Sequence, residues 1–174
     1  MKVMKFGGTS VGSAQRMKDV AEIIINEGKN IIVLSAMSGT TNSLLEISDY
    51  LYKRNPDGAN ETINMLELKY FREIEELFES KEYKIQTLDV IKSHFDYIRS
   101  FTKKVFTLFE EKVIVAQGEL LSTVIFSYYL KERGLNAILL PALEFMRINK
   151  NAEPDQNYIR EHLTALLEEH KEAD

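Results

Sequence analysis

Residues 3–34 carry the pattern of one βαβ unit, and this pattern limits the fold more than any other feature of the chain. The three runs are the strand 3–6, the helix Ala14–Glu27 and the strand Ile31–Leu34. The pair Gly7-Gly8 breaks the chain after the first strand, and Gly28 stands where a helix C-terminal glycine belongs. We therefore expect parallel strands, and we expect the β-branched second strand to be buried on both faces.

Helical patterns dominate the rest of the chain. We expect a helix Ser43–Lys53, a helical insertion of two or three helices at about 60–112, a helix that follows Gly118-Glu119 and stops at Gly134, a buried strand Ala137–Leu140, and a final helix that begins near Asp155. Strands separated by helices predict an α/β fold, here a three-layer α/β/α sandwich with a mainly parallel sheet and a helical insertion.

Composition excludes several classes of function. The 174 residues carry a formal net charge of −5, which argues against a nucleic-acid partner, and no cysteine is present to form a disulfide or a thiolate metal site. The N-terminus lacks the apolar run of a signal peptide, and we read no stretch as a membrane span. We expect a cytoplasmic protein that acts on a small molecule.

A glycine-rich turn between strand and helix lets backbone N–H groups approach a phosphate closely. Gly7 and Gly12 have the outer spacing of a P-loop, but Ser13-Ala14 stands where that motif needs Lys and then Ser or Thr. Thr9 occupies the position of the second glycine in the dinucleotide fingerprint. Both motifs are rejected, and a simple tight turn stays an alternative.

Four further side chains could carry chemistry. Lys5 ends the first strand, where its ammonium could stabilise a transferring phosphoryl group, although a lysine there is often merely solvated. The hydroxyl-rich loop after the second strand offers Ser35 and Thr41 for a substrate, although such hydroxyls also cap helices. Glu119 is expected at the beginning of a helix, where it could pair with a substrate ammonium or only with the helix dipole.

The motifs "KFGGTS", "VLSAMSGTTN", "QGELLS" and "NAEPD", in this order, resemble the aspartate kinase branch of the amino-acid kinase family. The resemblance implies a catalytic Lys5, a nucleotide-binding segment of Lys5, Phe6, Gly7, Gly8, Thr9 and Ser10, and an aspartate site of Ser35, Thr41 and Glu119. Arg147 and Asn149 resemble a loop near the substrate.

The implied reaction transfers the γ-phosphoryl group of ATP, with Mg²⁺ on its phosphates, to the β-carboxylate of L-aspartate. This is the first step toward lysine, threonine and methionine. A carboxylate with a pKa near ~3.9 is already ionised at neutral pH, so no general base is needed. The three histidines lack the spacing of a metal site. We also expect a homo-oligomer in the full-length protein.

No glycine follows Gly134, so the second glycine-rich segment with which the family holds its nucleotide is missing from this sequence. We therefore expect the substrate-side, N-terminal portion of a longer protein, without its nucleotide-binding half and regulatory domains, and inactive by itself. Two alternatives stay open: a kinase for glutamate, acetylglutamate or carbamate, and a non-catalytic binding or assembly module.

Overall fold

The computed structural model describes residues 1–25 and 28–173. It begins with β1 (Lys2–Phe6), α1 (Ala14–Ile25) and β2 (Asn30–Leu34), and the two strands pair in parallel from Lys2–Asn30 to Phe6–Leu34. The predicted βαβ unit is therefore confirmed. The expected helix end at 26–27 lies outside the described residues, and Gly28 has the positive φ of 73° that suits a glycine.

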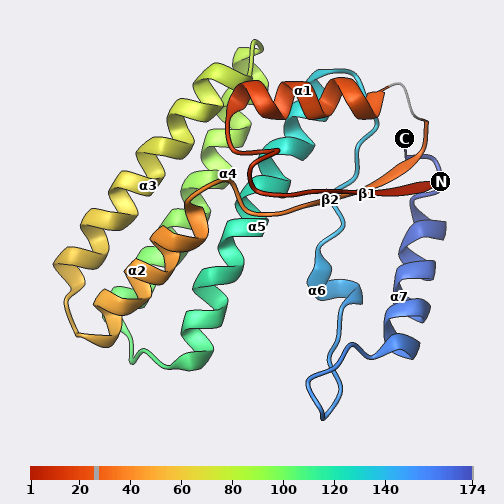
Figure 1. Cartoon of the computed structure of the whole chain (residues 1–174). Helices are drawn as coiled ribbons and strands as arrows, with labels where there is room; N and C mark the ends of the chain where they lie inside the picture. Colours follow the sequence, from red (N-terminus) through yellow and green to blue (C-terminus); the bar gives the residue numbers. More distant parts are fainter. Residues whose placement is uncertain (26–27, 174) are drawn as a thin grey trace.

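The core covers one face of this small sheet. Met4, Phe6 and Ile32 pack against the hydrophobic core, whereas Val3 and Val33 are 69% and 41% exposed. Alternate residues of a strand point to opposite faces, so the second face is open in the described structure. The expectation that the second strand is buried on both faces is wrong here, because α1 and the core occupy only one side (Figure 1).

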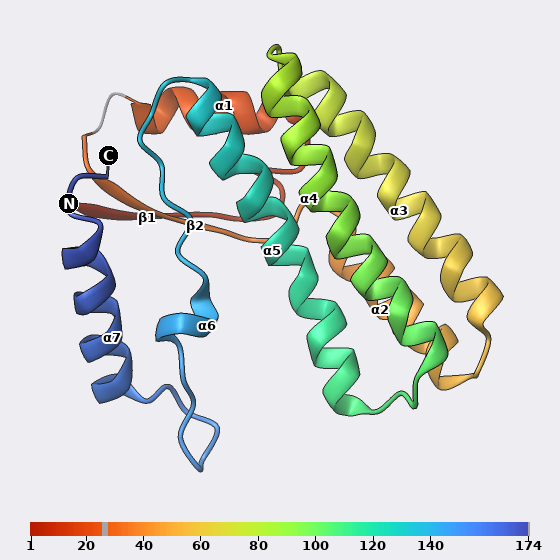
Figure 2. The same ribbon diagram turned by 180° about the vertical axis from the view of Figure 1, so that it is seen from behind.

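Four helices form a bundle beside the carboxyl ends of both strands (Figures 1 and 2). They are α2 (Thr40–Tyr52), α3 (Pro56–Leu77), α4 (Lys81–Ser100) and α5 (Leu108–Glu132), with the short 3₁₀ helix η1 (Phe101–Lys103) before α5. The largest fully buried side chains of the bundle include Tyr70 and Phe95, whose rings meet edge to face at 5.6 Å. The predicted helical insertion is therefore confirmed as α3, α4 and the first turn of α5.

Helix α5 begins well before the predicted position. Thr107 and Glu110 form a capping box, so the helix starts at Leu108 and includes the run Val113–Ala116. A helix surrounded by other helices is apolar on all sides. Its sequence therefore lacks the alternation of apolar and polar faces by which a helix is recognised. Contrary to the sequence-based expectation, α5 is long and apolar enough to cross a membrane by composition, but 61% of its most apolar window is buried within the protein, as in a core helix.

The C-terminal segment differs from its prediction in one element. Ala137–Leu140 is not a strand, because in the described part of the chain neither β1 nor β2 pairs with it, and a strand needs such a partner for its backbone. The chain continues through α6 (Ala142–Phe145) to α7 (Gln156–Glu169), which lies apart from the bundle in both views (Figures 1 and 2). The predicted cap is confirmed, since Asp155 accepts a hydrogen bond from the Tyr158 N–H at 3.2 Å.

Candidate active site

Two loops meet where the parallel strands end. The loop after β1 and the loop after β2 are joined by two hydrogen bonds, from Ser35 N to Phe6 O at 3.0 Å and from Ser38 Oγ to Gly8 O at 2.9 Å. The carboxyl edge of a parallel sheet is the usual position of a ligand in α/β folds. The structure therefore brings the glycine-rich segment and the hydroxyl-rich loop together.

Three glycines allow this close approach. A Cβ on Gly8 would lie 2.7 Å from the carbonyl oxygen of Ala36, and a Cβ on Gly118 would lie 2.8 Å from the Ala36 methyl group. A Cβ on Gly12 would lie 2.6 Å from Ser38 Oγ. Gly8 and Gly118 thus serve the packing of backbone segments against Ala36, in addition to any contact with a phosphate.

Helix α5 lies against the same loop and carries the predicted carboxylate. Ser122 donates to Ser35 O at 2.8 Å, and the exposed Glu119 lies one turn earlier on this helix. Glu119 is therefore in the middle of α5. The sequence argument that a helix dipole favours its charge is wrong, because that effect is confined to the first and last turns.

Thr41 lies exposed in the first turn of α2. The helix begins after Gly39, which has a φ of 80° and receives no cap from a side chain, and Ser38 uses its hydroxyl to bind Gly8. The alternative that these hydroxyls only cap the helix therefore has no support at Ser38. Ser35, Thr41 and Glu119 lie on three neighbouring segments, which is compatible with a shared substrate.

Lys5 lies two residues before Gly7, the first glycine of the glycine-rich loop. It pairs with Val33 in the sheet register and is exposed on the open face, opposite to the face that packs into the core. The Lys5 side chain is therefore exposed beside the glycine-rich loop, close to the ends of the strands.

The N-terminus of α1 is already occupied by a protein carboxylate. Glu73 Oε2 accepts a hydrogen bond from the Ala14 N–H, the first residue of α1, at 2.6 Å. Within the preceding loop, Ser10 N donates to Gly7 O at 2.9 Å. A phosphate in this loop would therefore meet other N–H groups than these two, and the dipole of α1 is compensated by Glu73.

A buried pair of hydroxyls lies behind the loop. Tyr70 OH and Thr40 Oγ1 are 2.9 Å apart, and both residues are fully buried. Burial raises the pKa of the Tyr70 phenol far above its usual value, the hydrogen bond with Thr40 opposes this shift, and the charge of Glu119 adds to it. Tyr70 is thus neutral at physiological pH. It lies within electrostatic reach of the carboxylate of Glu119, which is predicted to bind the substrate.

Arg147 and Asn149 are not brought to this site. They lie in a turn between α6 and α7, where Arg147 covers the ring of Tyr158 at 5.1 Å and Asn149 accepts from the N–H of Asn151 at 2.8 Å. Both views place this turn away from the glycine-rich loop (Figures 1 and 2).

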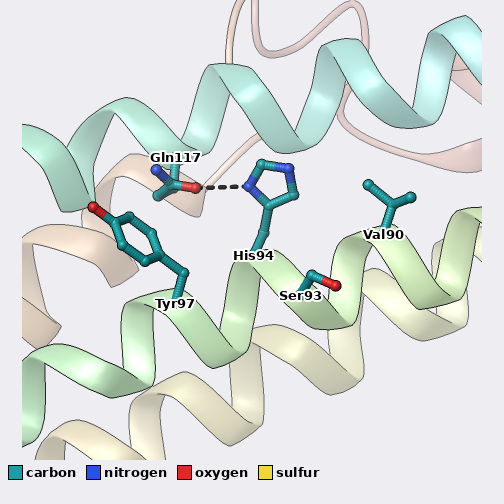
Figure 3. A pocket seen from close by; sticks show the side chains of 5 residues that line it. All are labelled: Val90, Ser93, His94, Tyr97 and Gln117. Carbon is teal, nitrogen blue, oxygen red and sulfur yellow. Dashed lines mark hydrogen bonds between the residues drawn. The ribbon is translucent and has the colours of Figure 1, made fainter.

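A cavity of about 340 Å³ lies between α4 and α5, and the residues that line it belong to these two helices. Figure 3 shows His94 and Gln117 facing each other across it, with Gln117 Oε1 2.7 Å from His94 Nδ1. An amide oxygen only accepts, so this contact places a proton on Nδ1. Neither the glycine-rich loop after β1 nor the hydroxyl-rich loop after β2 lines this cavity, so we do not regard it as the active site.

Sequence reasoning missed four residues that support the loops. Ser122 stands in the motif "QGELLS" and could have been assigned from it. Lys69, Tyr70 and Glu73 lie in the helical insertion, and their charged and aromatic side chains look like those of any amphipathic helix. Among residues 1–25 and 28–173, no group of three or more His, Asp or Glu side chains gathers to hold a metal ion.

Comparison with known proteins agrees with this geometry. The sequence model of the amino acid kinase family matches residues 1–172, and the chain therefore belongs to that family. It is 37% identical over 149 residues to aspartokinase 2, chloroplastic, of Arabidopsis thaliana, an alignment that covers 82% of this chain. It also resembles the crystal structure of Escherichia coli aspartokinase III in complex with aspartate and ADP, with a TM-score of 0.76, 27% identity and 99% of this chain covered.

A second structure of the Escherichia coli enzyme, in complex with lysine and aspartate, superposes with a TM-score of 0.82 and 26% identity over 99% of this chain. The chain spans 39% of each of these two structures and 26% of the Arabidopsis relative. The helix-rich α/β fold with a small parallel sheet is thus the fold of the corresponding part of aspartokinases.

The packing at Ala36 predicts different effects for two adjacent glycines. Gly8→Ala should lower the free energy of unfolding by about 1–3 kcal/mol, because the methyl group would collide with a backbone carbonyl. Gly7→Ala is the matched control, since nothing lies within 4 Å of its Cβ position. Urea unfolding of both variants measures the difference. Equal stabilities would contradict the proposed role of Gly8 in packing.

Proposed function

We propose that this chain carries the substrate-side part of an aspartate kinase. The observation that carries the proposal is the convergence of Gly7-Gly8, Ser35 and the Gly118-Glu119 turn of α5 at one sheet edge, in a chain that is 37% identical to an aspartokinase. In the proposed reaction, a β-carboxylate oxygen of L-aspartate attacks the γ-phosphorus of ATP. The bond to the bridging oxygen breaks, and 4-phospho-L-aspartate and ADP are formed.

The residues of this chain would position the substrates and neutralise charge. Glu119 would pair with the aspartate ammonium, and the hydroxyls of Ser35 and Thr41 would hold the substrate at the strand ends. Lys5 would stabilise the negative charge that the transferring phosphoryl group carries in the transition state. The acceptor carboxylate is already ionised at neutral pH, so this mechanism assigns no general base.

ATP would contact the segment Lys5–Ser10, which includes Phe6 and Thr9, chiefly through its phosphates. Mg²⁺ usually binds through one or two carboxylates together with substrate phosphates. We place it on the nucleotide phosphates and assign it no step. The chain spans about a quarter of its Arabidopsis relative. We therefore propose that residues beyond this chain supply the rest of the nucleotide site. On the family resemblance alone, we also propose that the whole protein is a cytoplasmic homo-oligomer.

Competition between acceptors tests the substrate. The complete gene product should release ADP with L-aspartate at a rate of roughly 1–100 per second. Acetylglutamate and carbamate should support far slower release, because they lack the free amine that Glu119 would bind. Glutamate has this amine, and its slower release would show that the site selects the shorter side chain. Faster release with any of these competitors would assign the enzyme to another branch of the family.

Lys5 should act on the rate of the chemical step. In the complete gene product, Lys5→Ala should lower kcat by about 10²–10³-fold, because one charged contact to the transferring phosphoryl group is lost. Lys103→Ala, on the exposed surface of η1, is the control and should leave kcat unchanged. Steady-state kinetics at saturating substrates measures both, and an unchanged kcat in the Lys5 variant would refute its role.

The 174-residue chain by itself should not turn over ATP, since part of the nucleotide site is proposed to lie elsewhere. The measurement is aspartate-dependent ADP release by the pure chain, compared with the complete gene product at equal concentration. Release by the short chain at roughly 1–100 per second would show that it holds the whole site.

A further inference from the structure

One turn of α3 contacts three parts of the candidate active site. Lys69 Nζ donates to Ser38 O, and Tyr70 OH lies 2.9 Å from Thr40 Oγ1. Glu73 accepts from the first N–H of α1. Glu73 follows Tyr70 by three residues and Lys69 by four, and residues at these spacings lie on one side of a helix, so neighbouring parts of one α3 surface reach all three contacts.

Lys69 holds the loop that carries the predicted substrate hydroxyls. Its ammonium binds the carbonyl of Ser38 and lies 3.8 Å from the Cβ position of Gly39, the residue from which α2 begins. A cation at a helix N-terminus opposes the helix dipole. Lys69 therefore gives little net stability to α2, and its contact with Ser38 mainly fixes the path of the loop.

Tyr70 holds the beginning of α2. Its hydroxyl binds the side chain of Thr40, which precedes the predicted substrate residue Thr41 and lies beside Gly118. The ring itself packs against Phe95 in the core. The hydroxyl and the ring thus have separable functions, and Tyr70→Phe removes the first while it keeps the second.

Glu73 fixes the end of the glycine-rich loop. Its carboxylate caps α1 at Ala14, so the loop between β1 and α1 is held at one end by the sheet and at the other end by α3. The same helix face therefore determines where both ligand loops lie relative to each other.

We propose that Lys69, Tyr70 and Glu73 are positioning residues that shape the binding sites of the two substrates. They fix the positions of three segments relative to one another: the hydroxyl-rich loop after β2, the first turn of α2 and the end of the glycine-rich loop. The helical insertion is, on this view, a part of the substrate-binding apparatus. The kinetic consequences rest on the proposed function, whereas the consequences for loop order do not.

Kinetics of the complete gene product tests the proposal. Lys69→Met and Tyr70→Phe should raise the KM for aspartate about three- to tenfold, the effect of one hydrogen bond, with kcat nearly unchanged and a smaller rise in the KM for ATP. Glu73→Leu should instead raise the KM for ATP by a similar factor. Glu73→Gln should restore it, because an amide oxygen can still accept from Ala14.

Two variants away from the loops are matched controls. Lys84→Met removes an ammonium that binds Glu75 at 2.8 Å, and Tyr129→Phe removes a buried hydroxyl that binds Arg133 at 3.1 Å while the ring keeps its contact with Phe78. Both should leave the two KM values unchanged. If the controls raise KM as much as the α3 variants do, the effect is general destabilisation and the proposal is wrong.

The double variant Thr40→Val with Tyr70→Phe separates positioning from packing. It removes both hydroxyls, so no buried polar group is left without its partner and thermal stability should recover relative to Tyr70→Phe. The KM for aspartate should stay raised. A KM that recovers together with stability would show that the pair only stabilises the fold.

Amide hydrogen exchange gives a readout that needs no catalysis. Exchange of residues 35–42 should accelerate at least about threefold in Lys69→Met and Tyr70→Phe, while α4 and α5 stay protected as in the wild type. Unchanged exchange in this segment would overturn the positioning role. If the wild type lacks aspartate kinase activity but exchange changes as expected, the proposed function fails and the positioning role stands.

Discussion

The contact of three backbone segments around Ala36 is the constraint on which the site depends. Gly8 approaches its carbonyl group and Gly118 approaches its methyl group, and either contact would be lost if a side chain stood at the glycine. Protein interiors are close-packed and relax only partly when volume is added. Two strand ends and α5 can therefore meet at one point only because the sequence places small residues there. The strand-end hydrogen bonds from Ser35 and Ser38 follow from this proximity.

The sequence predicted the local units well because their causes are local. The βαβ unit follows from runs of apolar residues with glycines between them, and the cap at Asp155 follows from one side chain. The start of α5 was misplaced, because a helix buried on all sides has no polar face to mark its period. The strand expected at Ala137–Leu140 failed for a different reason. A strand exists only with a partner, and no local pattern tells which partner the chain provides.

The sequence predicted the candidate site residues that stand in recognisable motifs. It did not predict the residues that contact the site only through tertiary packing. Lys5, Ser35 and Glu119 stand beside recognisable glycine or hydroxyl patterns, whereas Lys69 and Glu73 act on residues 31 and 59 positions earlier in the chain. A lysine or glutamate on an amphipathic helix carries no local signal of such a contact. The dipole argument for Glu119 failed because the start of α5 was misplaced. One error in a helix boundary thus removed the physical reason given for a candidate site residue.

The connections between the loops also bear on how the substrates would influence each other. Ser38 binds the glycine-rich loop directly, and α3 holds Ser38 through Lys69 and the start of α1 through Glu73. A displacement of one loop therefore has to move the other or break a hydrogen bond. Packed interfaces of this kind change between discrete arrangements more readily than they deform continuously. A ligand that holds one loop would consequently also restrict the other loop through the packing around Ala36, in addition to the direct contact between the reacting carboxylate and phosphate.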